Sequence, residues 1–294
     1  MNDHIPSLAD LRHDIDVLDD QILDLLRRRA ETVQRIAEAK GREPGTAAGQ
    51  ADGFLRPGRE AQILRRLASR MRGGLPVAAL SRIWRELISA LYHYQAQVKV
   101  AVHAPNKSAA RWDLARDFYG STTPMQLCTT ASAVFRALAQ PATLGILALP
   151  EEGEKECWWP LLASRSPDSP RIVARLPFVP NPRGRFAELG AYVIANAPPE
   201  ESGDDITLLV LQLSEGSPSM ARLSSLLGQV GLAGQPVAQY RRSSEEGARV
   251  LLELSGFVTA EDARLAALIA ADPAQILDAV VIGAYAVPLA AEGE

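Results

Sequence analysis

Residues 7–40 read SLADLRHDIDVLDDQILDLLRRRAETVQRIAEAK, and this stretch decides the N-terminal architecture. Its apolar residues recur at alternating steps of four and three, the spacing of one buried helical seam. They are Leu11, Ile15, Leu18, Ile22 and Leu25. The pattern predicts a single helix over 7–42, about 50 Å long at 1.5 Å per residue. Such a helix needs another chain or another long helix to cover its seam.

The same seam, continued toward the C-terminal end of the helix, reaches two cations. The steps land on Arg29, Val33, Ile36 and Lys40. Arg29 and Lys40 project within about 20° of one another, because 11 residues are close to three helical turns. A buried unpaired charge is costly, so we expect an anion to meet them. The alternatives are a solvated helix end, or pairing with Glu60 or another acid.

Arg12 lies on a different face of this helix. It precedes Arg29 by 17 residues, a rotation of about −100°. It therefore cannot point into the same pocket of its own chain, but it could reach the pocket of a neighbouring chain. The alternative is an ordinary exposed arginine.

Two more helices complete an all-helical unit over 1–97. The first is predicted at 59–71 and the second at 76–97, with Pro76 as the first helical residue. From 98 to about 200, short apolar runs alternate with helices, which is typical of an α/β layer. From 206 the order of elements is βαββαβ, a ferredoxin-like plan, and PPEESGDD at 198–205 marks the boundary before a third domain at 204–294.

Composition excludes several classes of protein. The chain has 294 residues and a net charge of −4, which argues against a nucleic-acid binder. The first 97 residues carry 15 basic and 13 acidic side chains, so the basic excess lies at the N-terminal end. Two cysteines cannot build a disulfide framework or a structural zinc site. Without a signal peptide or an 18-residue apolar run, we expect a cytoplasmic protein with no membrane partner.

The first third of the chain resembles a known family. The stretch quoted above, RPGREAQILRRL at 56–67 and IWRELISALYHYQ at 83–95 are together similar to the all-helical chorismate mutase domain of bifunctional chorismate mutase/prephenate dehydratases. The resemblance implies a three-helix domain that intertwines in a homodimer. It covers nearly all of 7–97, and charged positions on three separate helices match together.

The resemblance also implies a role for each matched residue. Arg29 binds a substrate carboxylate, and Lys40 reaches a carboxylate and the ether oxygen. Gln95 contacts the same ether oxygen, and Glu60 accepts from the substrate hydroxyl with Arg59 beside it. A further substrate contact comes from the partner subunit through Arg12.

The implied chemistry explains why these residue types suffice. Chorismate is a dianion that rearranges to prephenate in one pericyclic step, so no cofactor, metal or nucleophile is needed. Arginines hold the carboxylates in the reactive chair. Lys40 and Gln95 stabilise negative charge that grows on the ether oxygen as the C–O bond breaks. With an amide at position 95, activity should not require acidic pH.

The remaining regions resemble the later domains of the same family. VKVAVHAPNKSAARWDLARDFYG at 98–120 is similar to the start of prephenate dehydratase, but about 80 residues of a second lobe are missing and the catalytic Thr-Arg-Phe signature reads Gly190-Ala191-Tyr192. We therefore expect a truncated domain without dehydratase activity. The pair Trp158 and Trp159 either forms a binding platform or covers the face left bare. VIGAYAVP at 281–288 is similar to the last strand of an ACT regulatory domain.

The predicted protein is a dimeric chorismate mutase of aromatic amino-acid biosynthesis, with a pseudo-dehydratase region and an ACT-like domain. Three alternatives stay open. The first is a bifunctional mutase/dehydratase, and the second is a non-catalytic sensor of an aromatic amino acid. The third is an assembly module, which could associate with another shikimate-pathway enzyme.

Overall fold

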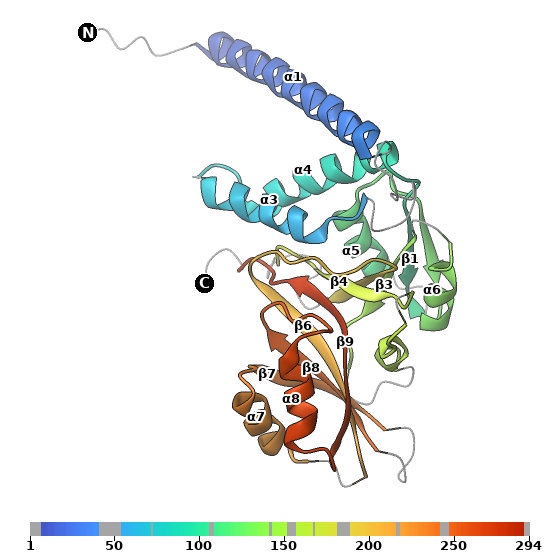
Figure 1. Cartoon of the computed structure of the whole chain (residues 1–294). Coiled ribbons are helices and arrows are strands. Elements are labelled where there is room, and N and C mark those ends of the chain that lie inside the picture. The colour runs from blue at the N-terminus through green and yellow to red at the C-terminus, as the bar shows by residue number, and fades with distance from the viewer. Residues whose placement is uncertain are drawn as a thin grey trace, which may run out of the picture.

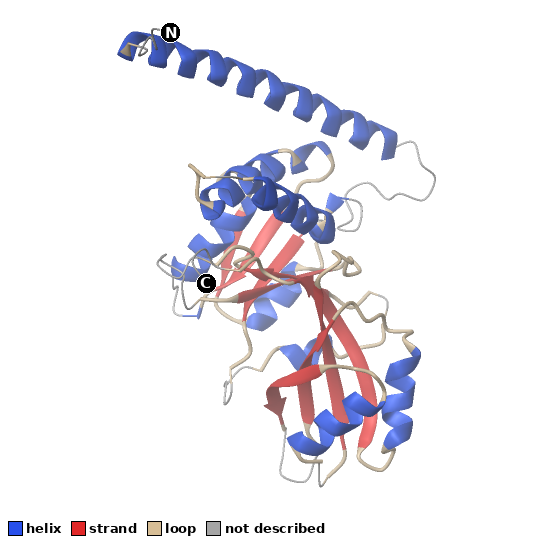
Figure 2. Ribbon diagram, turned by 90° about the vertical axis from the view of Figure 1, so that its left-hand side faces the viewer, coloured by secondary structure: helices blue, strands red, loops and turns tan. Residues whose placement is uncertain are grey.

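A computed structural model describes residues 7–40, 54–71, 73–105, 109–140, 143–151, 157–166, 168–180, 189–215, 218–241 and 247–290. A long N-terminal helix projects from a body that contains the other helices and one large sheet (Figure 1). A view turned by 90° shows the same projecting helix above the body (Figure 2).

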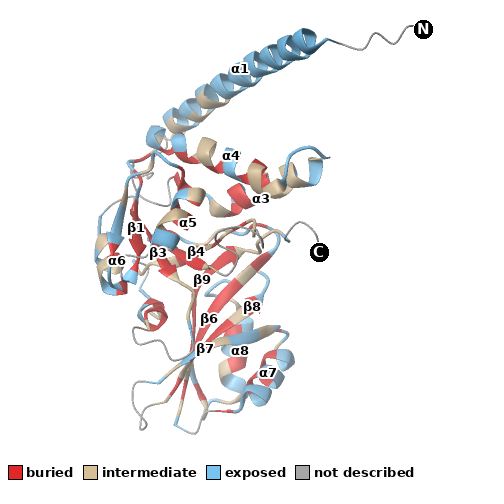
Figure 3. Cartoon of the chain, turned by 180° about the vertical axis from the view of Figure 1, so that it is seen from behind, coloured by how far each residue is buried: buried red, intermediate tan, exposed pale blue. Residues whose placement is uncertain are grey.

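The projecting helix is α1 (Leu8–Lys40), which confirms the long helix expected from the seam. A reciprocal cap starts it: the Ser7 backbone N–H donates to Asp10 Oδ2 at 2.9 Å, and the Asp10 N–H donates to Ser7 Oγ at 3.2 Å. None of its residues is buried, and it is pale blue along most of its length in Figure 3. Its apolar seam, for example Ile15 at 57% exposed and Leu25 at 60%, is thus uncovered in the single chain.

The two shorter helices are α3 (Pro57–Arg70) and α4 (Val77–Ala90). The prediction that the last helix continues to Gln97 is wrong. Pro76 caps α4 from outside, α4 ends at Ala90, and a 3₁₀ helix, η1 (Tyr92–Tyr94), follows. Tyr92, Ala96 and Val98 are buried in the core shared by α3, α4 and the sheet. This tertiary burial turns the chain away from the helix axis, where sequence periodicity alone continues the helix.

One mixed sheet of nine strands forms the body. In sheet order the strands are β2 (Met125–Cys128), β1 (Lys99–His103), β3 (Thr143–Ala148), β5 (Ala191–Ala195), β4 (Arg171–Leu176), β9 (Ile276–Ala286), β6 (Asp205–Leu213), β8 (Arg249–Ser255) and β7 (Gly234–Tyr240). β1 pairs in parallel with β2 and β3, and the connections run through α5 (Ala109–Tyr119) and α6 (Ala131–Ala137). This α/β region agrees with the alternation read from the sequence.

The last four strands follow the predicted βαββαβ order. They are antiparallel in the order β9-β6-β8-β7, and the connections include α7 (Met220–Gln229) and α8 (Ala263–Ala271). Leu223, Leu226 and Leu268 of these helices pack on Leu209 and Leu211 of β6. The C-terminal region therefore has the ferredoxin-like arrangement.

The two sheet regions join where β4 meets β9. Ile172 lies opposite Gly283, whose φ of +153° and missing Cβ permit the approach: a Cβ there would lie 2.2 Å from the Ile172 carbonyl oxygen. Trp158 and Trp159 are fully buried behind this junction, with their rings against Tyr192 and Tyr240. A binding platform formed by the tryptophan pair is therefore wrong. The division into 98–200 and 204–294 remains a prediction about sequence units, and both contribute to a single sheet.

Candidate functional site

The C-terminal end of α1 meets the segment that follows α4. Lys40 Nζ donates to Gln95 Oε1 at 3.2 Å, and both side chains are half-buried. Gln95 directly follows η1, so the early end of α4 places it opposite the last residue of α1. Two residues 55 positions apart, whose shared role at the ether oxygen is implied only by the family resemblance, are thus in direct contact.

Arg29 faces the same side of α1 as Lys40. It is half-buried, as are Val33 and Ala37, whereas Ile36, expected on this stripe, is 46% exposed. Nη1 of Arg29 is buried and has no hydrogen-bond partner in the described part of the chain. Loss of hydration lowers the pKa of this guanidinium from its ordinary value. Arg29 therefore retains a desolvated donor that an anion could satisfy.

Glu60 lies in a buried cluster between α3 and α4. Its carboxylate accepts from Arg85 Nη1, and Tyr92 Oη donates to it at 2.7 Å. Arg85 is 3% exposed and its guanidinium lies 3.7 Å from the Phe118 ring centroid. Burial and the neighbouring Glu60 raise the pKa of the Tyr92 phenol well above its ordinary value. Glu60 is therefore held by an ion pair and a phenol, not by Arg29 or Lys40 as one alternative proposed.

The remaining two selected residues are exposed. Arg59 donates its backbone N–H to Glu200 Oε2 at 3.2 Å, so its recorded contact is with the segment before β6. Arg12 is exposed near the outer end of α1, about 42 Å along the helix axis from Lys40. It cannot join the Lys40–Gln95 pair of its own chain. The single chain thus brings Lys40 and Gln95 into contact and keeps Arg29 on the same face of α1, about 16 Å along the axis from Lys40. It holds Glu60, Arg59 and Arg12 elsewhere.

Arg85 and Tyr92, the partners of Glu60, were not predicted as functional residues from the sequence. A signal for Arg85 exists in IWRELISAL at 83–91, where an arginine interrupts a mostly apolar helix. The same reasoning that selected Arg29 and Lys40 could have selected it. Tyr92 carried no such signal, because a tyrosine is common on a buried face.

The described residues form neither a metal-binding cluster nor a membrane-spanning helix. They contain no group of three or more His, Cys, Asp or Glu side chains that could hold a metal ion. No helix among them is both long and apolar enough to cross a membrane.

Comparison with known proteins identifies the helical region. Residues 11–96 match the family model of chorismate mutase type II. Two bifunctional chorismate mutase/prephenate dehydratases are similar: one from Pseudomonas aeruginosa is 31% identical over 46% of this chain and 36% of the relative, and one from Aquifex aeolicus is 34% identical over 44% and 34%. The matched part thus spans about a third of the length of these curated relatives.

A solved prephenate dehydratase from Streptococcus mutans overlaps with 64% of this chain and 97% of that chain, with a TM-score of 0.44 and 12% identity. Residues 11–96 form a chorismate mutase type II domain, in a chain that is homologous over the matched portion to bifunctional chorismate mutase/prephenate dehydratases.

Proposed function

We propose that this chain catalyses the rearrangement of chorismate to prephenate in aromatic amino-acid biosynthesis. The observation that carries the proposal is the contact between Lys40 Nζ and Gln95 Oε1. Lys40 donates to Gln95 in this contact, and both side chains carry N–H groups of the kind needed at a breaking C–O bond. The helix face of Lys40 also carries the desolvated Arg29. The matched family of residues 11–96 supports the same reaction.

The geometry of the pair suggests how it acts. Because the Gln95 carbonyl oxygen faces Lys40, its amide NH₂ points away from the ammonium, and we propose that it donates to a ligand atom. An ether oxygen bound beside Lys40 would accept from Nζ, and from the Gln95 NH₂ after that amide rotates toward it. These bonds strengthen as negative charge develops on that oxygen, so they lower the barrier rather than merely bind the substrate.

Arg29 has a separate task in the proposal. Chorismate carries two carboxylates, and Arg29 would bind one of them through its unsatisfied guanidinium. The second carboxylate needs another cation, which the exposed Arg12 of a partner subunit would supply. The pericyclic step itself transfers no proton to the protein, so the residues only bind, orient and stabilise charge.

We propose a homodimer formed along α1. The uncovered seam supports this, because Leu11, Ile15, Leu18 and Ile22 are each at least 46% exposed in the single chain. A second copy of α1 carries a complementary apolar stripe. In such a pair Arg12 would point away from its own Arg29 and toward the partner's site.

Glu60 and Arg59 enter the proposal through the family resemblance. Glu60 would accept from the substrate hydroxyl only after releasing Arg85 or Tyr92. Its contacts favour a positioning role instead: through Tyr92 it holds η1, and Gln95 follows directly after η1.

The rest of the chain is proposed to be a dehydratase-like region without activity, followed by an ACT-like domain. In support, Ala191 and Tyr192 lie on the fully buried β5, and Gly190 offers no hydroxyl where the family's catalytic threonine is expected. The ferredoxin-like order of β6 to β9 supports the ACT-like assignment. Buried residues of α3 and of the segment after α4 share one hydrophobic core with β1, β3, β4 and β5. We therefore propose that the dehydratase-like region supports the mutase helices structurally.

The test follows the loss of chorismate absorbance with purified full-length protein. We expect Arg29→Ala and Lys40→Ala each to lower kcat/KM by about 10²–10³-fold, as for other charge-stabilising donors. Arg35→Ala is the matched control, because Arg35 is an exposed arginine of the same helix. A folded wild-type protein without a rate above background would refute the proposal. Product analysis separates the alternatives: phenylpyruvate would indicate a bifunctional enzyme, and amino-acid binding without turnover a sensor.

Shared sites are tested by mixing inactive chains. In a mixed dimer of Arg12→Ala and Arg29→Ala subunits, one site combines both substitutions and the other has neither. Activity should therefore return on mixing. If it does not return although mixed dimers form, Arg12 does not act across subunits.

A further inference from the structure

The first turn of α3 is capped by a residue from a distant part of the chain. Arg56, which precedes the helix, makes no side-chain capping hydrogen bond. Instead, Glu200 Oε2 accepts from the Arg59 backbone N–H at 3.2 Å, and Glu200 Oε1 accepts from Arg56 Nε. A capping oxygen accepts from the second or third helical N–H, and Arg59 is the third residue of α3. The carboxylate, 141 positions away, also places a negative charge at the positive end of the helix.

The backbone beside Glu200 lies directly against the same turn. A Cβ on Gly58 would lie 2.7 Å from the Glu201 carbonyl oxygen and 2.9 Å from that of Glu200. At either distance the two atoms would overlap, so this close approach requires glycine. Farther along α3, Arg65 Nη2 donates to the Asp204 carbonyl oxygen at 2.7 Å. The segment before β6 therefore contacts α3 at two places.

The segment that carries Glu200 is itself held at the start of β6. The buried carboxylate of Asp205 accepts from the Ser202 N–H at 2.9 Å, from Ser202 Oγ at 2.5 Å and from the Gly203 N–H at 3.1 Å. Three hydrogen bonds to one carboxylate fix the turn between Glu200 and β6. The cap of α3 is thus supplied by a braced part of the C-terminal region.

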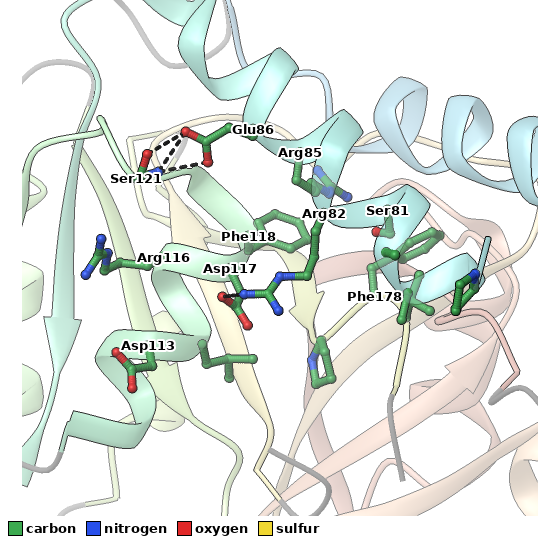
Figure 4. A pocket seen from close by; sticks show the side chains of 16 residues that line it. Ser81, Arg82, Arg85, Glu86, Asp113, Arg116, Asp117, Phe118, Ser121 and Phe178 are labelled. Carbon is green, nitrogen blue, oxygen red and sulfur yellow. Dashed lines mark hydrogen bonds and ion pairs between the residues drawn. The ribbon is translucent and has the colours of Figure 1, made fainter. Parts of the chain in front are cut away.

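Helix α4, against which α3 packs, is anchored separately. Arg82 of α4 reaches across a cavity of about 740 Å³ to Asp117 of α5, with Nη2 2.5 Å from Oδ1 (Figure 4). Glu86 of α4 accepts from the Ser121 backbone N–H at 2.9 Å and from Ser121 Oγ at 2.6 Å. These contacts tie α4 to α5 and to the turn that follows it. The first turn of α3 therefore lies between two fixed parts of the molecule.

This turn leads directly to the proposed mutase site. Glu60 is the residue after the capped N–H, and its carboxylate accepts from Tyr92 Oη at 2.7 Å. The Tyr92 carbonyl oxygen in turn accepts from the Gln95 backbone N–H at 2.8 Å. Gln95 Oε1 accepts from Lys40 Nζ at 3.2 Å. A continuous series of hydrogen bonds and neighbouring residues therefore connects the cap to the pair proposed to act at the ether oxygen.

We propose that Glu200 is a positioning residue of the mutase site. It caps α3 from the C-terminal region and thereby holds Gln95 opposite Lys40, and this role requires no contact with the substrate. The inference rests on the proposed function, but the cap itself can be measured without activity. It gives the region after the mutase helices a specific task, which is to complete the first turn of α3.

The first test is hydrogen–deuterium exchange of the full chain. In Glu200→Ala the amides of 57–62 and 92–96 should exchange about five- to thirtyfold faster, because a helix that loses its cap opens more often. The amides of α8 should exchange as in the wild type. Glu201→Ala is the matched control, because Glu201 is the exposed neighbouring glutamate. Faster exchange over the whole chain, or wild-type exchange at 92–96, would overturn the proposal.

A second variant perturbs the same contact and leaves Glu200 in place. Alanine favours a helix more than glycine does, so local propensity alone predicts that Gly58→Ala stabilises α3. The added Cβ instead displaces α3 from the backbone of residues 200 and 201. We therefore expect faster exchange at 57–62 and 92–96. Exchange that is unchanged or slower in Gly58→Ala would overturn the close approach on which the cap depends.

Mutase kinetics then test the positioning role. Per mole of folded protein, Glu200→Ala should lower kcat by about 5- to 100-fold, since a displacement of about 1 Å can cost about 10²-fold. KM should change less than about twofold, because Arg29, the proposed carboxylate ligand, lies on α1. Glu200→Gln keeps an acceptor oxygen for the Arg59 N–H, so its kcat should lie closer to that of the wild type.

The outcomes separate this inference from the proposed function. An unchanged kcat in Glu200→Ala, or equal kcat in Glu200→Ala and Glu200→Gln, would refute the positioning role in an active enzyme. A folded wild-type protein without mutase activity would instead refute the proposed function. In that case the exchange rates at 57–62 still decide whether Glu200 caps α3.

Discussion

Replacing Glu60 by alanine tests whether this residue is a structural anchor. Its side chain is 8% exposed and that of Arg85 is 4% exposed. In Glu60→Ala the guanidinium of Arg85 stays buried without its counter-ion, and the Tyr92 hydroxyl loses the acceptor it reaches at 2.7 Å. Breaking one partner of a buried ion pair costs about 3–5 kcal/mol. An unpaired buried hydroxyl adds about 1–3 kcal/mol, although the two costs are not additive.

We therefore expect the free energy of unfolding to fall by at least about 3 kcal/mol. The double variant Glu60→Leu/Arg85→Leu should recover part of this loss, because an apolar pair leaves no uncompensated charge. Urea unfolding followed by tryptophan fluorescence measures both. The control is Arg165→Ala, whose pair with Asp278 is 66% and 40% exposed and should contribute less than about 1 kcal/mol.

The result that would refute this reasoning is a stable Glu60→Ala protein. If its unfolding free energy falls by less than about 1 kcal/mol while mutase activity is lost, Glu60 is not buried with Arg85 in solution. It would then be available to the substrate, as the family resemblance implies. If Glu60→Ala lowers both the free energy of unfolding and the mutase activity, Glu60 acts by positioning η1 and Gln95.

Three further predictions concern separate parts of the molecule. The mutase rate of the wild type should be level from about pH 5 to 8. In Gln95→Glu the rate should fall about 10²-fold as pH rises through the pKa of the new carboxyl, because an ionised carboxylate cannot donate to the ether oxygen. A pH–rate profile of each protein checks both expectations. Arg65 donates to the carbonyls of Ser202, Asp204 and Val287, so Arg65→Ala should lower the free energy of unfolding by about 3 kcal/mol in urea titrations, and a loss under about 1 kcal/mol would contradict these contacts. Asp262 caps α8, and its hydrogen bonds with Arg264 lower the pKa of its carboxyl to about 2 from the ordinary 3.8. The ionised carboxylate therefore stabilises the folded protein fully above about pH 4, and this stabilisation is lost as pH falls through about 2. Asp262→Ala should therefore cost about 1 kcal/mol at neutral pH, and its Tm should converge with that of the wild type near pH 2.

Most elements could be predicted from local pattern. The seam of α1, the apolar runs of β1, β3 and β6, and the βαββαβ order of the C-terminal region each follow from periodicity, and all are confirmed. β2 was missed because its four residues include two exposed ones and show no alternation. The end of α4 was misplaced because Tyr92 and Val98 leave the helix to enter a core that is built from distant residues.

Some residues of the candidate site could be predicted from helix periodicity, and others are brought together only by packing. Arg29 and Lys40 could be selected because they occupy a stripe of apolar residues on one helix, and periodicity reports which residues share a face. The partners of Glu60 could not be selected by spacing along one element. Arg85 and Tyr92 come from a second helix and from a 3₁₀ turn, and only their packing against α3 brings them to the carboxylate.

Helix periodicity was enough to predict the long helix, its apolar seam and the cations placed along it, because these depend on the fixed geometry of one helix. The structure added that the seam is uncovered in the single chain. The tertiary structure alone decided which charges meet: Lys40 with Gln95, Glu60 with Arg85, and Arg82 with Asp117 across a cavity. It also decided that strands of two sequence regions join into one sheet at Gly283. The physical reason is that side-chain pairing and desolvation depend on contacts between elements far apart in the chain, which no local repeat encodes.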